Sequence, residues 1–221
     1  MGQIVKIKSI EELTHDVLKI VAEKPQGLEF IPGQAVDVSI NKGGWEKEIR
    51  PFTFTSQPED DEIEFNIKTY TDHSGVTNEL RTLKAGDELI IGEVFGYINY
   101  RGEGTFIAGG AGFTPFISIL KMLDKKHEIG NNRLIYANKT RKDIIREEEF
   151  KQILGDKFVN ILSEEEAQGY QHGYVSPELI KENYDGEGKY VYICGPKPMQ
   201  EALKKQLKEI GVADEFIIYE K

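Results

Sequence analysis

Hydrophobic and polar positions follow two different rhythms along the chain. In the first hundred residues or so, short apolar–polar alternations are separated by turn signals, which predicts β-strands with one buried face. In the remainder, short apolar runs alternate with segments of helical spacing, which predicts parallel strands joined by helices. The change falls at the polar, glycine-containing segment 100–104. We therefore expect two domains, residues 1–101 and 102–221.

The first domain is expected to be a closed antiparallel β-barrel, because several short strands are spaced by turns. Turns are predicted at Pro32-Gly33, Gly43-Gly44 and Ala85-Gly86-Asp87, and a short helix at about 76–83. The strands are expected at about 3–7, 17–21, 35–40, 52–55, 63–67 and 88–91.

The second domain is expected to be α/β, with a parallel sheet covered by helices on both faces. Its apolar runs are short enough for buried strands, and its longer segments have helical periodicity. Strands are expected at 105–108, 133–137, 158–162, 190–194 and 215–219, and helices at 115–126, 147–154, 177–183 and 198–210.

Composition narrows the classes of partner. The 221 residues include 39% hydrophobic and 30% charged residues, which is typical of a globular protein. The net charge of −10 argues against a nucleic acid or an anionic membrane as the main partner. No apolar run is long enough to span a bilayer, and the first residues lack the features of a signal peptide. We expect a cytoplasmic protein with no membrane span.

Cysteine is scarce, and this limits the metal chemistry. Cys194 is the only cysteine, so neither an internal disulfide nor an iron–sulfur cluster held by four thiolates can form within the chain. No metal site is predicted.

The segment 109–115, Gly-Gly-Ala-Gly-Phe-Thr-Pro, follows a predicted strand and precedes a predicted helix. Glycines allow a sharp turn and a close approach to a ligand. Thr114 is expected to be the N-cap and Pro115 to lie in the first helical turn. Exposed N–H groups at such a helix start can bind a phosphate. The simpler alternative is a tight strand-to-helix turn without a ligand.

A second glycine cluster, Cys194-Gly195-Pro196 followed by Met199, also joins a predicted strand to a helix. Both clusters lie at the carboxyl ends of predicted parallel strands, where α/β sheets bind ligands. Cys194 alone would more often be a small buried core residue. Its position before Gly195-Pro196 favours a functional role.

Two further clusters lie in the first domain. Arg50 opens the strand-like run 50–56, and its guanidinium requires an anionic or polar partner. The alternative is a salt bridge to one of the many carboxylates. The segment Ser74-Gly75-Val76-Thr77 is typical of a capped helix start that could bind an anion. Alone it indicates only a helix start.

In this order, the four clusters resemble the ferredoxin–NADP reductase superfamily, and its flavodoxin and ferredoxin reductases most closely. The resemblance covers nearly the whole chain. Arg50, Phe52 and Thr53 are similar to the family's Arg-x-Tyr-Ser/Thr flavin motif, with Phe52 in place of tyrosine. Residues 74–77 are similar to its pyrophosphate-binding helix start, with the glycine one place later than in many relatives.

The resemblance implies FAD and NADPH or NADH as cofactors. Arg50 would neutralise the FAD pyrophosphate, and Cys194 would lie near the nicotinamide. The implied catalytic residues are Cys194 and Thr53. The implied cofactor-binding residues are Arg50, Pro51, Phe52, Thr53, Ile67, Lys68, Thr69, Ser74, Gly75, Val76 and Thr77 for FAD, and Gly110, Gly112, Thr114, Pro115, Asn138, Lys139, Arg141, Gly195, Pro196 and Met199 for the nucleotide.

The loop after the second strand of the α/β domain is expected to select the nucleotide. An adenosine 2′-phosphate prefers arginine or lysine, whereas a free ribose prefers an acid. Lys139, Arg141 and Lys142 are present, and no acid directly follows the strand, which favours NADPH. The alternative is an exposed basic loop without this role.

The resemblance implies an FAD-dependent oxidoreductase that takes a hydride from NAD(P)H and passes single electrons to a separate carrier, such as flavodoxin or ferredoxin. The alternatives are an electron-transfer subunit of a larger oxygenase or dehydrogenase, a non-catalytic nucleotide-binding module, and a flavin-free dehydrogenase. Tyr219 could cover the flavin as a terminal aromatic residue, but it also fits the last strand, which we prefer.

Overall fold

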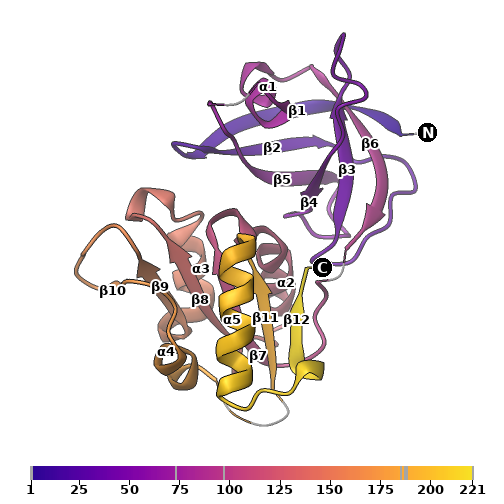
Figure 1. The fold of residues 1–221 in the computed structure, drawn as a ribbon. Helices are drawn as coiled ribbons and strands as arrows, with labels where there is room; N and C mark the ends of the chain where they lie inside the picture. The colour runs from indigo at the N-terminus through magenta and orange to yellow at the C-terminus, as the bar shows by residue number, and fades with distance from the viewer. Residues whose placement is uncertain (1, 73, 97, 185, 187–188, 221) are drawn as a thin grey trace.

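The chain forms two β-sheets that follow one another in the sequence (Figure 1). The computed structural model describes residues 2–72, 74–96, 98–184, 186 and 189–220. None of the helices in these ranges has the length and apolar character that a bilayer crossing requires.

The first sheet has six antiparallel strands in the order β4-β3-β6-β1-β2-β5. An isolated antiparallel bridge between Phe54 and Phe65 joins the two edges, so the sheet closes into the predicted barrel. Its strands are β1 (Gln3–Thr14), β2 (Val17–Glu23), β3 (Ala35–Ile40), β4 (Arg50–Thr53), β5 (Glu62–Lys68) and β6 (Glu88–Phe95).

Alternating apolar side chains fill the barrel. The rings of Phe30 and Phe54 stack at a centroid distance of 4.0 Å, and Phe54 and Phe65 at 5.4 Å. The short helix α1 (Val76–Glu79) and the 3-10 turn Leu80–Thr82 add two buried side chains to this core. The helix is thus where the sequence predicts it, but its N-cap is Gly75 and no side chain caps it.

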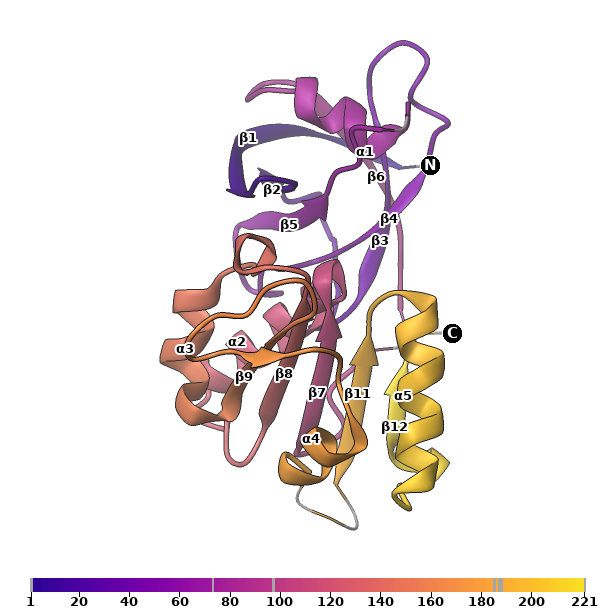
Figure 2. The same cartoon turned by 60° about the vertical axis from the view of Figure 1, so that its left-hand side comes forward.

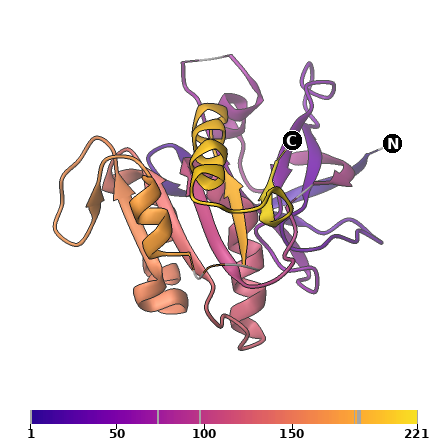
Figure 3. The same ribbon diagram turned by 60° about the horizontal axis from the view of Figure 1, so that its bottom comes forward.

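The second sheet has six parallel strands in the order β10-β9-β8-β7-β11-β12. Helices cover both of its faces, as predicted (Figures 2 and 3). Its strands are β7 (Gly104–Gly109), β8 (Arg133–Asn138), β9 (Phe158–Leu162), β10 (Gln171–His172), β11 (Tyr190–Cys194) and β12 (Ile217–Tyr219), and its helices are α2 (Thr114–Lys125), α3 (Glu147–Leu154), α4 (Pro177–Glu182) and α5 (Lys197–Glu209).

Successive strand residues point to opposite faces of this sheet, and each face has its own core. Phe106 and Tyr136 pack with helices α2 and α3, whereas Ile107 and Ile135 pack with α4 and α5. Helices bury both faces of this parallel sheet, and its strands therefore contain almost no charged side chains.

Three local predictions need correction. Thr114 is the first residue of α2 and not its N-cap, because Gly110–Phe113 already forms a 3-10 turn. The last strand begins at Ile217, after a 3-10 turn over Asp214–Phe216, and not at residue 215. The two-residue strand β10 was not predicted, since it is too short to leave a periodic pattern.

Candidate functional site

A cavity of about 270 Å³ lies where the barrel meets the start of α2. Strands β4 and β5 supply most of its wall, and Tyr70 after β5, helix α1, the 3-10 turn after β7 and the start of α2 supply the remainder. Its lining residues are Arg50, Pro51, Phe52, Thr53, Asn66, Ile67, Lys68, Tyr70, Thr77, Ala111 and Thr114.

Arg50 lies at the solvent edge of this cavity, because β4 is an edge strand and begins at that residue. Its side chain is 48% exposed and lies 3.8 Å from the carboxylate of Glu48. A single, partly exposed ion pair of this kind contributes little to stability. The guanidinium therefore remains available to a ligand anion.

A second cavity of about 410 Å³ lies at the carboxyl ends of the parallel strands. This is the edge at which α/β sheets bind ligands. Its lining residues are Lys68, Tyr70, Gly109, Gly110, Ala111, Gly112, Ala137, Asn138, Lys139, Asp143, Ser163, Gly173, Tyr174, Pro196 and Met199.

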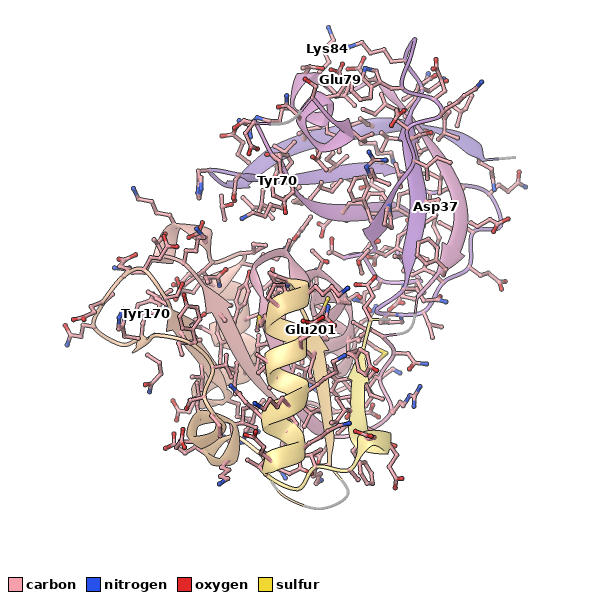
Figure 4. All side chains as sticks on the ribbon, viewed as in Figure 1. Asp37, Tyr70, Glu79, Lys84, Tyr170 and Glu201 are labelled. Carbon is pink, nitrogen blue, oxygen red and sulfur yellow. The ribbon has the colours of Figure 1, made fainter. Side chains whose placement is uncertain are left out.

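The two cavities adjoin. Lys68, Tyr70 and Ala111 belong to the walls of both. Figure 4 shows Tyr70 on the side of the barrel nearer the parallel sheet, in contrast to Glu79 and Lys84. Two ligands bound in these cavities would therefore approach each other at one place, where β5 ends and the glycine turn begins.

Glycine is favoured at different positions of the turn for different physical reasons. A Cβ on Gly112 would lie 2.3 Å from the carbonyl oxygen of Cys194, and one on Gly109 would lie 2.3 Å from the sulfur of Met199. These two glycines let the turn pack against the second glycine cluster. Gly110 has a φ of +52° and open space around its Cβ position, so its backbone is accessible to a ligand.

Cys194 is 7% exposed and is not part of either cavity wall. Burial, with a smaller contribution from the carboxylate of Glu220, raises the pKa of its thiol to about 12. The thiol therefore stays protonated at neutral pH, which excludes chemistry that requires a thiolate.

Lys68 lies in the shared wall and pairs with Asp16, at 2.6 Å between Nζ and Oδ2. Burial acts to raise the pKa of Asp16, but the hydrogen bond and the charge of Lys68, together with Thr14 and His15, outweigh it, and the pKa is lowered. His15 and Asp143 lie beside this pair, and the side chains of His15, Asp16 and Asp143 approach within 4.8 Å of one another. An ammonium group already contacts Asp16, so this cluster is an ion-pair network between the two halves.

Several predicted site residues lie outside both cavity walls. Val76 is buried in the barrel core, Pro115 is buried in α2, and Thr69 binds the backbone of Asp16 through its hydroxyl. The predicted residues outside both walls are Thr69, Ser74, Gly75, Val76, Pro115, Arg141, Cys194 and Gly195.

Other wall residues were not predicted from the sequence. Ser163 directly follows β9, so the rule for strand ends could have found it. Asp143 lies five residues beyond β8, and a 3-10 turn brings it back to the cavity. The wall residues without a prediction are Asn66, Tyr70, Gly109, Ala111, Ala137, Asp143, Ser163, Gly173 and Tyr174.

Comparison with known proteins identifies both halves. A family model described as "FAD-binding domain" matches residues 3–90, and one described as "Oxidoreductase NAD-binding domain" matches residues 106–205. NADH-cytochrome b5 reductase 1 of Neosartorya fischeri is 30% identical over 93% of this chain and 73% of its own length. The reductase component of propane 2-monooxygenase from Rhodococcus jostii is 30% identical over 98% of this chain, which spans 62% of that relative.

Solved structures show the same fold. The flavohaem-like FAD/NAD-binding domain of nitric oxide dioxygenase from Vibrio cholerae has a TM-score of 0.88 at 24% identity, and the match covers 99% of this chain and 97% of that one. A ferredoxin NADP⁺ reductase from Neisseria gonorrhoeae, with bound FAD and NADP, has a TM-score of 0.85 at 18% identity, and the match covers 98% of this chain and 97% of that one. The chain therefore belongs to the ferredoxin–NADP reductase superfamily and uses FAD and a nicotinamide nucleotide as cofactors.

Proposed function

We propose that the chain is an NADH-oxidising flavoprotein reductase, with residues 1–101 as the FAD domain and residues 102–221 as the nucleotide domain. The observation that carries the proposal is the shared wall of the two cavities at Lys68, Tyr70 and Ala111. A flavin in one cavity and a nicotinamide in the other would meet there. The FAD, when bound, accepts a hydride and releases electrons one at a time.

The first cavity suits FAD. Arg50 offers a charged, bidentate donor for the pyrophosphate at the cavity edge. Phe52 and Thr53 lie in the wall where the family motif places its flavin contacts, and Phe52 can stack although it lacks the tyrosine hydroxyl. Ile67 and Lys68 belong to the edge strand β5, so their backbone groups are available to the ring. These residues would hold and orient the flavin.

The second cavity suits the nicotinamide nucleotide. The open backbone at Gly110 would receive the pyrophosphate, and Thr114 would contribute from the adjoining wall of the first cavity, at the start of α2. Cys194, protonated and packed behind the turn, would help to exclude water from the reacting atoms. Thr53 lines the adjoining first cavity from the barrel and would contact the reacting ring of the flavin there.

We further propose NADH as the preferred nucleotide, although the sequence favours NADPH. The Nζ of Lys139 lies 2.9 Å from Glu164, and the guanidinium of Arg141 lies over the ring of Tyr170. Asp143 also lines the cavity, and although its Oδ2 accepts from Thr140, its Oδ1 could accept from a ribose hydroxyl. The curated relatives named NADH-cytochrome b5 reductase support this choice.

We propose a separate one-electron carrier protein as the acceptor. The names of the relatives favour a cytochrome b5 or an oxygenase component, and flavodoxin or ferredoxin stays a prediction from the sequence. The net charge of −10 would slow association with acidic carriers at low ionic strength.

Reconstitution with FAD tests the proposal. The loaded protein should be yellow and should bleach when NADH is added without oxygen. Arg50→Ala should weaken FAD binding by roughly 10- to 100-fold, the range expected for a charge-assisted hydrogen bond. Arg101→Ala is the matched control, because Arg101 is exposed and lies outside both walls.

A protein that cannot be loaded with FAD would refute the proposal. For the FAD-loaded protein, the rates of electron delivery to cytochrome b5, ferredoxin and flavodoxin can be compared. Bleaching without delivery to any of them would favour a permanently bound subunit of a larger assembly.

A further inference from the structure

Arg146 lies between the two halves of the protein in an uncommon conformation. Its φ of 55° is left-handed, and it immediately precedes α3. Its side chain is only 11% exposed. A non-glycine residue in this region costs free energy and persists only where its surroundings hold it there. The contacts of its side chain supply that constraint.

The Arg146 guanidinium reaches from the nucleotide half to the barrel strand β5. Its Nη2 lies 2.6 Å from Glu64 and its Nε donates to Asn66 Oδ1 at 2.8 Å. Its Nη1 donates to Glu149 in α3 at 2.8 Å. A buried guanidinium requires such partners, because it cannot lose its proton.

These contacts fix the orientation of the Asn66 amide. A guanidinium only donates hydrogen bonds, so the oxygen of Asn66 must face Arg146 and the NH₂ group must face away. Asn66 is 4% exposed and belongs to the wall of the first cavity. Among the described residues, no acceptor reaches its Nδ2. A buried donor without an acceptor is costly, and native proteins rarely keep one.

We propose that Asn66 is a flavin-contacting residue, whose Nδ2 donates to a carbonyl oxygen or ring nitrogen of the isoalloxazine, and that Arg146 is its positioning residue. This inference rests on the proposed assignment of the first cavity to FAD. Bound flavin supplies the acceptor that the protein lacks. Because Arg146 belongs to the nucleotide half, the contact also makes flavin binding depend on the seating of that half against the barrel.

The decisive variant is Asn66→Asp. It keeps an oxygen for Arg146 and replaces the NH₂ donor by a carboxylate oxygen that cannot donate when ionised, so the contact between the halves persists. FAD titration of the apoprotein should show binding about tenfold weaker or worse, the equivalent of one lost hydrogen bond. The visible absorption band of the bound flavin should also shift. Lys125→Ala is the control, because Lys125 forms an exposed ion pair with Glu59 between the same halves.

Two further variants keep the test decisive. Asn66→Leu removes the donor with similar volume and should weaken FAD binding as well, which covers the case in which Asn66→Asp does not fold. Arg146→Gln as a single variant should weaken FAD binding. In the double variant with Asn66→Asp, it should cause no further loss of FAD affinity.

Each contrary outcome has one meaning. Wild-type affinity and spectrum in a folded Asn66→Asp protein would overturn the flavin contact. Additive losses in the double variant would overturn the positioning role of Arg146. A wild-type apoprotein that does not bind FAD would instead refute the proposed function.

Discussion

Substitution of Gly112 by alanine tests whether the glycine turn is required for packing. The new Cβ would lie 2.3 Å from the Cys194 carbonyl oxygen and 2.4 Å from its carbon. Contacts of a real Cβ lie beyond about 3 Å, so the two segments must separate by roughly 1 Å. The obstacle is backbone at the end of a central strand, which cannot move aside as a flexible side chain could.

Overpacking of this kind costs about 2–3 kcal/mol. For a chain of this size, that cost lowers Tm by roughly 4–12 °C. Gly110→Ala is the matched comparison, because its Cβ would meet no atom within 4 Å and only its φ of +52° is unfavourable. That strain costs about 1 kcal/mol, so its Tm should fall by roughly 2–4 °C.

Thermal unfolding of the apoproteins, followed by circular dichroism, measures both effects. Nucleotide affinity of the FAD-loaded proteins supplies the second readout, and Gly110→Ala should lose affinity although it folds well. The reasoning would be refuted if Gly112→Ala were as stable as the wild type, or if Gly110→Ala were the less stable of the two.

Three other predictions concern charge and reactivity. Glu164→Gln should free Lys139, which pairs with Glu164 at 2.9 Å, for a 2′-phosphate. It should raise kcat/KM for NADPH several-fold and leave kcat/KM for NADH unchanged. An unchanged kcat/KM for NADPH would contradict the idea that this ion pair keeps Lys139 from the nucleotide. Cys194 should resist iodoacetamide at pH 8 in the folded protein and react after unfolding, because burial raises its pKa to about 12. Mass spectrometry measures the fraction of Cys194 that is alkylated, and full alkylation of the folded protein would contradict this prediction. Asp16→Asn should lower Tm at pH 7, since the folded-state pKa of Asp16 is lowered and its pairing with Lys68 stabilises the charged form. The difference should shrink as the pH falls below about 4, and a difference constant with pH would exclude this ion pair.

The sequence predicts the fold well where periodicity is strong. Strands Ala35–Ile40, Phe158–Leu162 and Tyr190–Cys194 have the predicted bounds. Helix starts are less predictable, because a cap depends on backbone angles. Thr114 has the chemistry of an N-cap, yet its hydroxyl donates to the carbonyl oxygen of Ala111, because the chain already forms a 3-10 turn before it.

The sequence also predicts which segments form the site, but only part of its wall. Clusters at strand ends are visible as motifs, whereas Asn66 and Tyr70 belong to no motif and enter the wall because β5 and the residues after it run along the cavity. Arg146 gives no local signal at all. Its partner Glu64 lies 82 positions earlier, so the contact exists only in the folded chain.

The position of the flavin cavity depends on how α2 is attached to the barrel. Helix α2 carries Thr114 into the cavity wall, and one turn later Ser118 is fully buried against the barrel. Ser118 Oγ accepts from the N–H of Gly33 at 3.0 Å, and its carbonyl accepts from Gln57 Nε2 at 3.0 Å. Buried hydrogen bonds are costly to break without replacement. Because the glycine turn leads directly into α2, these two bonds fix the turn relative to the barrel, so the separation between the proposed flavin and nicotinamide sites is set by the fold before either cofactor binds.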